Sequence, residues 1–168
     1  MARPHRSLNQ LLAQMADDLE ASCHPGAQIS TVPGIGDETT LAAYLMDKFD
    51  AKLPMVVSCP GHASPWSAFC HAFFARSPVI VIKGSRGLAG KTQLLGLLAT
   101  AEALILGADV TILGGSGRQS TQVHKARARF WAAPGAPRDL LAGDPGVTRT
   151  TFARGNVVEA LPASQRSV

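Results

Sequence analysis

A glycine-rich stretch that ends in lysine and threonine carries the clearest chemistry in the sequence. Its nine residues are Gly84, Ser85, Arg86, Gly87, Leu88, Ala89, Gly90, Lys91 and Thr92. Holding a polyphosphate requires converging backbone N–H groups, a helix N-terminus, a mobile cation and a hydroxyl that reaches magnesium. In this stretch Lys91 can reach the β- and γ-phosphates of a nucleotide, and Thr92 can offer its hydroxyl to Mg²⁺. The stretch therefore predicts an ATP-binding loop, with a fortuitous glycine-rich turn as the alternative.

The residues on either side of this loop predict the elements that position it. Residues 79–82 are apolar and partly β-branched, which predicts a strand, and residues 93–106 predict a helix that is apolar nearly all round. Gly107 ends that helix, and residues 109–113 predict a second strand. This order predicts a right-handed βαβ unit. One departure is Ser85, which stands where the usual phosphate-loop pattern has glycine.

Other helices are predicted on both sides of this unit. Residues 8–22 form an amphipathic pattern, most simply a packing face, with a partner-binding face as the alternative. Its apolar positions are Leu8, Leu11, Leu12, Met15 and Leu19. Asp37 can cap a second helix, and Ser64 followed by Pro65 predicts the start of a third. Residues 147–152 and 157–160 predict a β-hairpin.

Basic residues follow one stripe of a further predicted helix, from about residue 118 to 131. The stripe consists of Arg118, Gln122, Lys125 and Arg129. Either it is a solvated helix face, or it contacts a phosphate backbone. The formal charge of +4 and the isoelectric point near 9.3 fit an anionic partner such as a nucleotide or nucleic acid.

Cysteine usage and hydropathy indicate a reduced, cytosolic protein. The three cysteines, Cys23, Cys59 and Cys70, each lie near a histidine, but their spacing matches no standard zinc site, so packed thiols are preferred over metal binding. No segment has the length and apolar character of a signal peptide or a membrane span. We therefore expect neither secretion nor membrane association.

The sequence lacks the acidic residues that nucleotide hydrolysis needs. Hydrolysis requires a second strand that ends in paired carboxylates, one for magnesium and one for the attacking water. Glu159 follows two valines but stands alone, and Asp109 and Asp144 lie at the wrong ends of their segments. The chain is thus predicted to bind a nucleotide without carrying a complete catalytic centre.

Several segments together resemble the ATPase domain of the large terminase subunit of tailed bacteriophages, the motor that pumps DNA into capsids. They are Ser64–Phe69, the arginine-bearing loop 84–92, Ile112–Ser116 with Gln119, and Arg154–Ser164. These segments cover about residues 53 to 168, and the first fifty residues match no motif. The resemblance divides the chain into an N-terminal helical region, 1–52, and a partial P-loop ATPase domain, 53–168.

The resemblance implies an α/β fold of the P-loop NTPase type (ASCE-like), with a parallel sheet and flanking helices, incomplete at its C-terminal side. In that family a strand with the acidic pair, a coupling motif and a nuclease domain follow, whereas this sequence ends at Val168. The chain therefore looks like the N-terminal part of a terminase large subunit. The implied ligands are ATP and Mg²⁺, and the implied partners are double-stranded DNA, the small terminase subunit, the portal protein and further copies in a ring, in the host cytoplasm.

Individual roles carried over from the family each have a simpler alternative. Arg86 would approach the γ-phosphate, or it caps the loop or faces solvent. Pro65 and Trp66 would lie toward the adenine, although tryptophan at such a position is more often part of the core. Two other functions remain open for the chain, namely a non-catalytic nucleotide-binding or interaction module, and a different P-loop DNA translocase or helicase-like ATPase.

Overall fold

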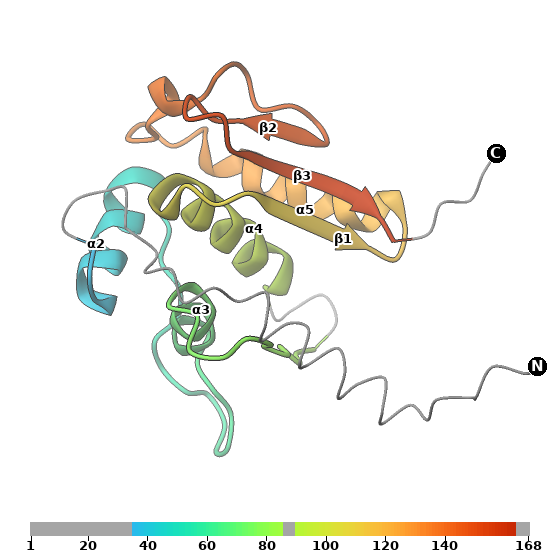
Figure 1. Cartoon of the computed structure of the whole chain (residues 1–168). Coiled ribbons are helices and arrows are strands. Elements are labelled where there is room, and N and C mark those ends of the chain that lie inside the picture. The colour runs from blue at the N-terminus through green and yellow to red at the C-terminus, as the bar shows by residue number, and fades with distance from the viewer. Residues whose placement is uncertain (1–34, 86–89, 164–168) are drawn as a thin grey trace, which may run out of the picture.

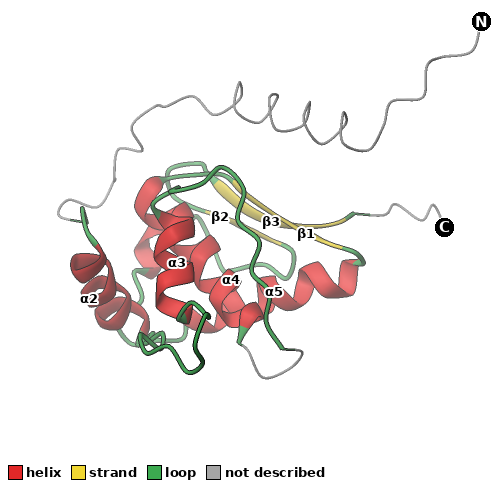
Figure 2. Ribbon diagram, turned by 90° about the horizontal axis from the view of Figure 1, so that it is seen from below, coloured by secondary structure: helices red, strands yellow, loops and turns green. Residues whose placement is uncertain are grey.

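The computed structural model describes residues 35–85 and 90–163, which form an α/β structure. A mixed three-stranded sheet lies against a group of helices (Figures 1 and 2). In chain order the elements are α2 (Glu38–Phe49), α3 (Pro65–Phe73), α4 (Lys91–Ala101), the π-helix η1 (Glu102–Leu106), β1 (Val110–Gly114), α5 (Gly117–Phe130), the 3₁₀-helix η2 (Arg138–Leu140), β2 (Arg149–Thr151) and β3 (Val157–Pro162). The helix predicted at residues 8–22 lies outside the described residues.

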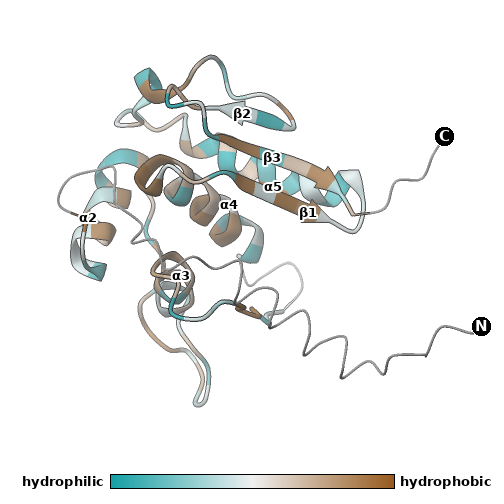
Figure 3. Ribbon diagram, in the orientation of Figure 1, coloured by the Kyte–Doolittle hydropathy of each residue, from teal (hydrophilic) through white to brown (hydrophobic). Residues whose placement is uncertain are grey.

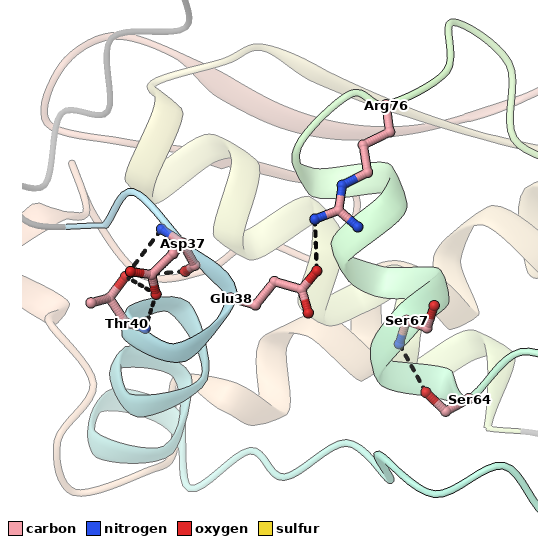
Figure 4. A network of polar contacts seen from close by, with 6 residues as sticks. All are labelled: Asp37, Glu38, Thr40, Ser64, Ser67 and Arg76. Atoms are coloured by element: carbon pink, nitrogen blue, oxygen red, sulfur yellow. Dashed lines mark hydrogen bonds and ion pairs between the residues drawn. The ribbon is translucent and has the colours of Figure 1, made fainter.

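The predicted helix starts are confirmed by their caps (Figure 4). A side-chain oxygen of Asp37 accepts a hydrogen bond from the backbone N–H of Thr40 at 2.8 Å, and α2 begins at the next residue after Asp37. Ser64 does the same for Ser67 at 3.0 Å, with proline in the first turn of α3. The helices α2 and α3 are linked by an ion pair of 2.6 Å between Glu38 and Arg76, which follows α3.

The sheet has the order β1-β3-β2, with β1 parallel and β2 antiparallel to β3. The hairpin predicted around residues 147–160 is confirmed as the β2–β3 pair. Because this hairpin adds an antiparallel strand, the sheet is mixed, whereas the resemblance implied a parallel sheet. The second predicted strand is β1, which lies one residue later than expected.

The strand expected at residues 79–82 does not form. The segment belongs to neither pairing of the sheet, and Val79 and Val81 are 60% and 88% exposed. A β-branched run becomes a strand only when a neighbouring backbone completes its hydrogen bonds, and β1, β2 and β3 pair with one another instead. The prediction of a βαβ unit from residue 79 onward was therefore wrong, because only its helix and its second strand form.

The helix α4 is the centre of the packed interior, as its apolar sequence predicted. Leu94, Leu97 and Ala101 are buried, and the helix continues through η1 until Gly107 ends it in the left-handed conformation. A Cβ atom at Gly96 would lie 2.9 Å from the backbone nitrogen of Arg127, so glycine allows α4 and α5 to pack closely. The helices within the described residues are all too short or too polar to cross a membrane.

Candidate nucleotide-binding site

The two ends of the predicted phosphate loop are described, and its middle is not. Gly84 and Ser85 lead into the loop, and Gly90, Lys91 and Thr92 leave it. Four of the predicted site residues lie outside the described residues, namely Arg86, Gly87, Leu88 and Ala89. The γ-phosphate role expected for Arg86 therefore stays a prediction.

Lys91 joins the two ends of the loop. Its ammonium nitrogen donates hydrogen bonds to the carbonyl oxygens of Gly84 at 2.8 Å and Ser85 at 2.6 Å. An ammonium group has three donors, and two of them bond to these carbonyl oxygens. The lysine side chain is thus turned back toward Gly84 and Ser85, the first residues of the loop.

The loop feeds directly into the N-terminus of α4. Gly90 has φ +62°, a left-handed conformation that glycine adopts without strain, and no side chain caps the helix among the described residues. The first N–H groups of a helix and its dipole together favour an anion at this position. Gly90 and Lys91 therefore place backbone donors and a cation at the same helix end.

Thr92 is exposed at the second residue of α4. Its hydroxyl suits Mg²⁺, which prefers oxygen ligands and keeps several waters, but it is a single ligand. Groups of three or more acidic, histidine or cysteine side chains are absent from the described part of the chain. The residues present therefore fit a magnesium ion only if phosphate oxygens and water complete its coordination.

The carboxyl end of the parallel strand pair lies on the same side of the structure as the starts of α4 and α5 (Figures 1 and 2). Strand β1 turns into α5 at Gly114, where a Cβ atom would collide with the backbone nitrogen of Ser120. Ser116 caps α5 by accepting a hydrogen bond from the backbone N–H of Gln119. In open α/β sheets, ligands bind outside the carboxyl ends of the strands, and the start of α4, which bears Lys91, lies on that side of the structure.

Trp66 is part of the core. It is 9% exposed, and its ring stacks on Phe69 with centroids 5.8 Å apart and planes 13° from parallel. One ring face is therefore occupied within the protein, in agreement with the simpler alternative for this residue. Pro65 is half-buried in the first turn of α3. Their contact with adenine stays a prediction.

Two of the acidic residues considered for nucleotide hydrolysis, Asp109 and Glu159, lie in or beside the sheet. Asp109 accepts a hydrogen bond from the backbone N–H of Val157 at 2.8 Å, which ties the start of β1 to the start of β3. Glu159 lies in the middle of β3 rather than at its carboxyl end. Among the described residues, no pair of carboxylates follows β1.

Two cysteines have separate environments rather than a shared metal site. Cys59 is exposed and Cys70 is buried, and both are free thiols. Burial raises the pKa of Cys70 to about 12, so its thiol stays protonated. Cys23 lies outside the described residues. The prediction of packed thiols is confirmed for Cys70, whereas it was wrong for Cys59, which is exposed.

A buried polar cluster beneath α5 was missed in the sequence. A terminal nitrogen of Arg127 donates to His124 Nε2 at 3.0 Å and to the hydroxyl of Thr150. Both the arginine and the histidine are fully buried, and burial lowers the pKa of Arg127 to about 10. The sequence did contain a signal for this cluster, namely helical spacing. Ser120, His124 and Arg127 share the face of α5 opposite the basic stripe.

The basic stripe of α5 faces outward as its spacing predicted. Arg118, Gln122, Lys125 and Arg129 are all exposed, and α5 contains no acidic residue. Arg118, Gln122 and Lys125 line a shallow hollow with Gly117 and Thr121. The ion pairs found among the described residues, Lys48–Asp47 and Arg76–Glu38, involve none of these side chains.

Comparison with known proteins gives no relative from which a role could be transferred. No protein family, no curated protein and no solved structure matches this chain. The function is therefore inferred from the sequence and from the geometry of the site itself.

Proposed function

We propose that this chain is the ATP-binding part of a viral DNA-packaging motor of the large-terminase type. The observation that carries the proposal is the position of Lys91, which bonds to the carbonyl oxygens of Gly84 and Ser85 at the N-terminus of α4. A lysine held over a glycine-rich loop at a helix N-terminus suits a polyphosphate. The fold proposed for the complete protein is of the P-loop NTPase type.

In this proposal the loop and α4 share the work of nucleotide binding. Backbone N–H groups at the start of α4 and the ammonium group of Lys91 neutralise the β- and γ-phosphates. Thr92 contributes its hydroxyl to the Mg²⁺ that accompanies the nucleotide, and Arg86 approaches the γ-phosphate. The bound ion supplies charge neutralisation and orients the phosphates.

The chain by itself is proposed to bind ATP with negligible hydrolysis. The carboxyl ends of β1 and β3, at Gly114 and Pro162, bear no carboxylate that could polarise water. Hydrolysis is therefore proposed only together with a strand that supplies such a carboxylate pair.

Double-stranded DNA is the proposed substrate of the motor, and the exposed stripe of α5 is its proposed contact. The stripe presents Arg118, Lys125 and Arg129 on a helix without acidic residues, which fits a phosphate backbone. The small terminase subunit, the portal protein and a ring of copies are further partners that the resemblance proposes for the full-length protein.

Equilibrium binding of Mg·ATP to the full chain tests the proposal. We expect Lys91→Ala to weaken binding at least tenfold, because it removes the cation that meets the phosphates. Lys52→Ala, which removes an exposed lysine after α2, is the matched control and leaves the affinity unchanged. Equal affinities of the wild type and Lys91→Ala would rule out the site. Sustained ATP turnover by the purified chain would show that an acidic partner has been overlooked.

A non-catalytic nucleotide-binding or interaction module is the second candidate, and one observation favours it. Val79 and Val81 are exposed on a segment that pairs with no strand of the sheet. An unpaired β-branched segment is suited to pairing with another chain. Failure of the purified chain to unfold cooperatively, together with no rise in its melting temperature on addition of ATP, would favour an interaction module over a nucleotide-binding one.

A further inference from the structure

Strand β1 leaves one edge of the sheet unpaired. In the order β1-β3-β2 it pairs with β3 on one side, so among the described strands its other edge has no partner (Figure 1). The carbonyl oxygen of Gly114 accepts a hydrogen bond from the N–H of Ala163, on the β3 side. Backbone groups alternate in direction along a strand, so those of Thr111 and Leu113 point to the free edge. Such an edge is a template for another extended segment.

Residues 79–82 form an extended segment that also lacks a partner. They make no backbone hydrogen bond with another described residue. Their exposure alternates as in a strand, because Val79 and Val81 are exposed whereas the isoleucine after each of them is half-buried. The segment therefore has the side-chain pattern of a strand and unpaired backbone groups.

We propose that residues 79–82 of one chain pair antiparallel with the free edge of β1 in a second copy. The register pairs Val79, Ile80, Val81 and Ile82 with Leu113, Ile112, Thr111 and Val110, respectively. It brings the outward backbone groups of Thr111 and Leu113 onto the two exposed valines, which exchange hydrogen bonds with them. Strand β1 is largely apolar (Figure 3), and apolar pairs across neighbouring strands stabilise a sheet.

The residues on either side of the segment fit this register. Lys83 lies opposite Asp109, and neither side chain forms an ion pair with a described residue. Opposite charges directly across two strands attract each other. Pro78 lies opposite Gly114, at a position whose backbone groups point away from the partner strand, so its missing N–H removes no hydrogen bond. In a parallel register Lys83 would lie opposite Gly114, and the charges would not meet.

A second copy fits this pairing better than the same chain does. Within one chain, α4 connects the segment to β1, and a strand-helix-strand connection of this kind places its two strands parallel. The antiparallel register therefore requires another chain. Because the donor segment and the acceptor edge are different surfaces, copies add head to tail. This inference does not rest on nucleotide binding.

Sedimentation of the full chain over a concentration series tests the association. We expect the wild type to associate as its concentration rises. For Val81→Pro we expect an apparent dissociation constant about tenfold higher, because proline removes the N–H that bonds to Thr111. Val56→Pro, at another exposed valine, in the loop before α3, is the matched control and leaves the association unchanged. A wild type that stays monomeric at its highest soluble concentration would overturn the proposal.

Disulfide trapping tests the register, in a chain that carries Cys23→Ser and Cys59→Ser. Mixing a Val81→Cys chain with a Thr111→Cys chain should give a disulfide-linked dimer, because residues directly opposite each other bring their Cα atoms within disulfide range. Val56→Cys mixed with Thr111→Cys is the control and should give little of this dimer. If one chain with both Val81→Cys and Thr111→Cys closes its disulfide as a monomer, the segment pairs with its own β1 and the proposal is wrong.

Discussion

The ammonium nitrogen of Lys91 lies 2.6 Å from the carbonyl oxygen of Ser85, six residues earlier in the chain. Together with the bond to Gly84, this contact closes the loop at its base. Closing the base reduces the conformational freedom that a ligand would otherwise have to remove. The lysine therefore has two roles in the proposed site, shaping the loop and meeting the phosphate.

Replacing Thr92 by valine should separate magnesium binding from phosphate binding. Valine keeps the shape of threonine and removes the hydroxyl that is proposed to bind Mg²⁺. We expect the affinity for Mg·ATP to fall about tenfold, and the affinity for ATP in EDTA to stay unchanged. Titration calorimetry with and without Mg²⁺ measures both, with Thr39→Val on exposed α2 as the control. An equal loss in EDTA would contradict the magnesium role.

Gly114→Ala should destabilise the junction between β1 and α5. The new Cβ atom would collide with the backbone nitrogen of Ser120 and lie 2.9 Å from the carbonyl oxygen of Ser116. Neither backbone atom can move without shifting the start of α5, so we expect a loss of about 1–3 kcal/mol in the free energy of unfolding. Urea denaturation measures it. Gly117→Ala, where nothing lies within 4 Å of the added atom, is the control and should change stability by less.

Local sequence signals predicted the helices well because their caps are local. Asp37 and Ser64 each bond within three residues, and Gly107 ends its helix by its own conformation, so no distant contact is needed. The stripe of Arg118, Lys125 and Arg129 was predicted for the same reason, since helical spacing alone decides it.

Pairing and burial could not be predicted in the same way. Residues 79–82 have the composition of a strand, but a strand depends on a partner elsewhere in the chain, and these residues pair with none of the described strands. The buried position of Arg127 depends on Thr150, 23 residues away, for which the local sequence carries no signal. In the candidate site, the sequence predicted Lys91 as a phosphate-binding residue. It gave no sign of the hydrogen bonds from Lys91 to the carbonyl oxygens of Gly84 and Ser85.

Asn156→Asp should destabilise the protein more than Asn156→Ala. The side-chain amide of Asn156 donates to the carbonyl oxygens of Ala103 at 2.9 Å and Ala108 at 3.1 Å, so it ties the hairpin to the end of η1. Alanine leaves both carbonyls unbound, at a cost of about 1–3 kcal/mol, whereas a carboxylate adds repulsion from the same oxygens. Chemical denaturation at pH 7 measures the order. A smaller loss for Asn156→Asp would contradict this role of the amide.

Because of His124, the protein should become less stable as the pH falls into mild acid. Burial and then the charge of Arg127 lower the pKa of His124 to about 4, from an ordinary value of 6.5. In this range the unfolded chain takes up a proton that the folded chain does not, so stability falls as pH decreases from about 6.5 to about 4. We expect the melting temperature of the wild type to fall more steeply over this range than that of His124→Gln.

Glu102 should change stability with pH in the opposite direction to His124, and so it provides a control for this measurement. Burial raises the pKa of Glu102 to about 7, from an ordinary value of 4.5. The folded chain therefore keeps a proton that the unfolded chain releases, and stability falls as pH rises from about 4.5 to about 7. Comparing Glu102→Gln with the wild type should show a slope of opposite sign to that of the His124→Gln comparison. Equal slopes for all three proteins would contradict both assignments.

Neutralising the stripe of α5 should reduce the salt dependence of DNA binding. Each of Arg118→Gln, Lys125→Gln and Arg129→Gln removes one cation that is proposed to replace a counterion on a phosphate. Each should therefore lower the slope of log affinity against log salt by about 0.9 for duplex DNA, whatever its base sequence. Fluorescence anisotropy across a salt series measures the slope, with Lys52→Gln as the control on a different surface. Unchanged slopes in all three variants would show that the stripe only faces solvent, because a helix face that does not contact DNA phosphates releases no counterions.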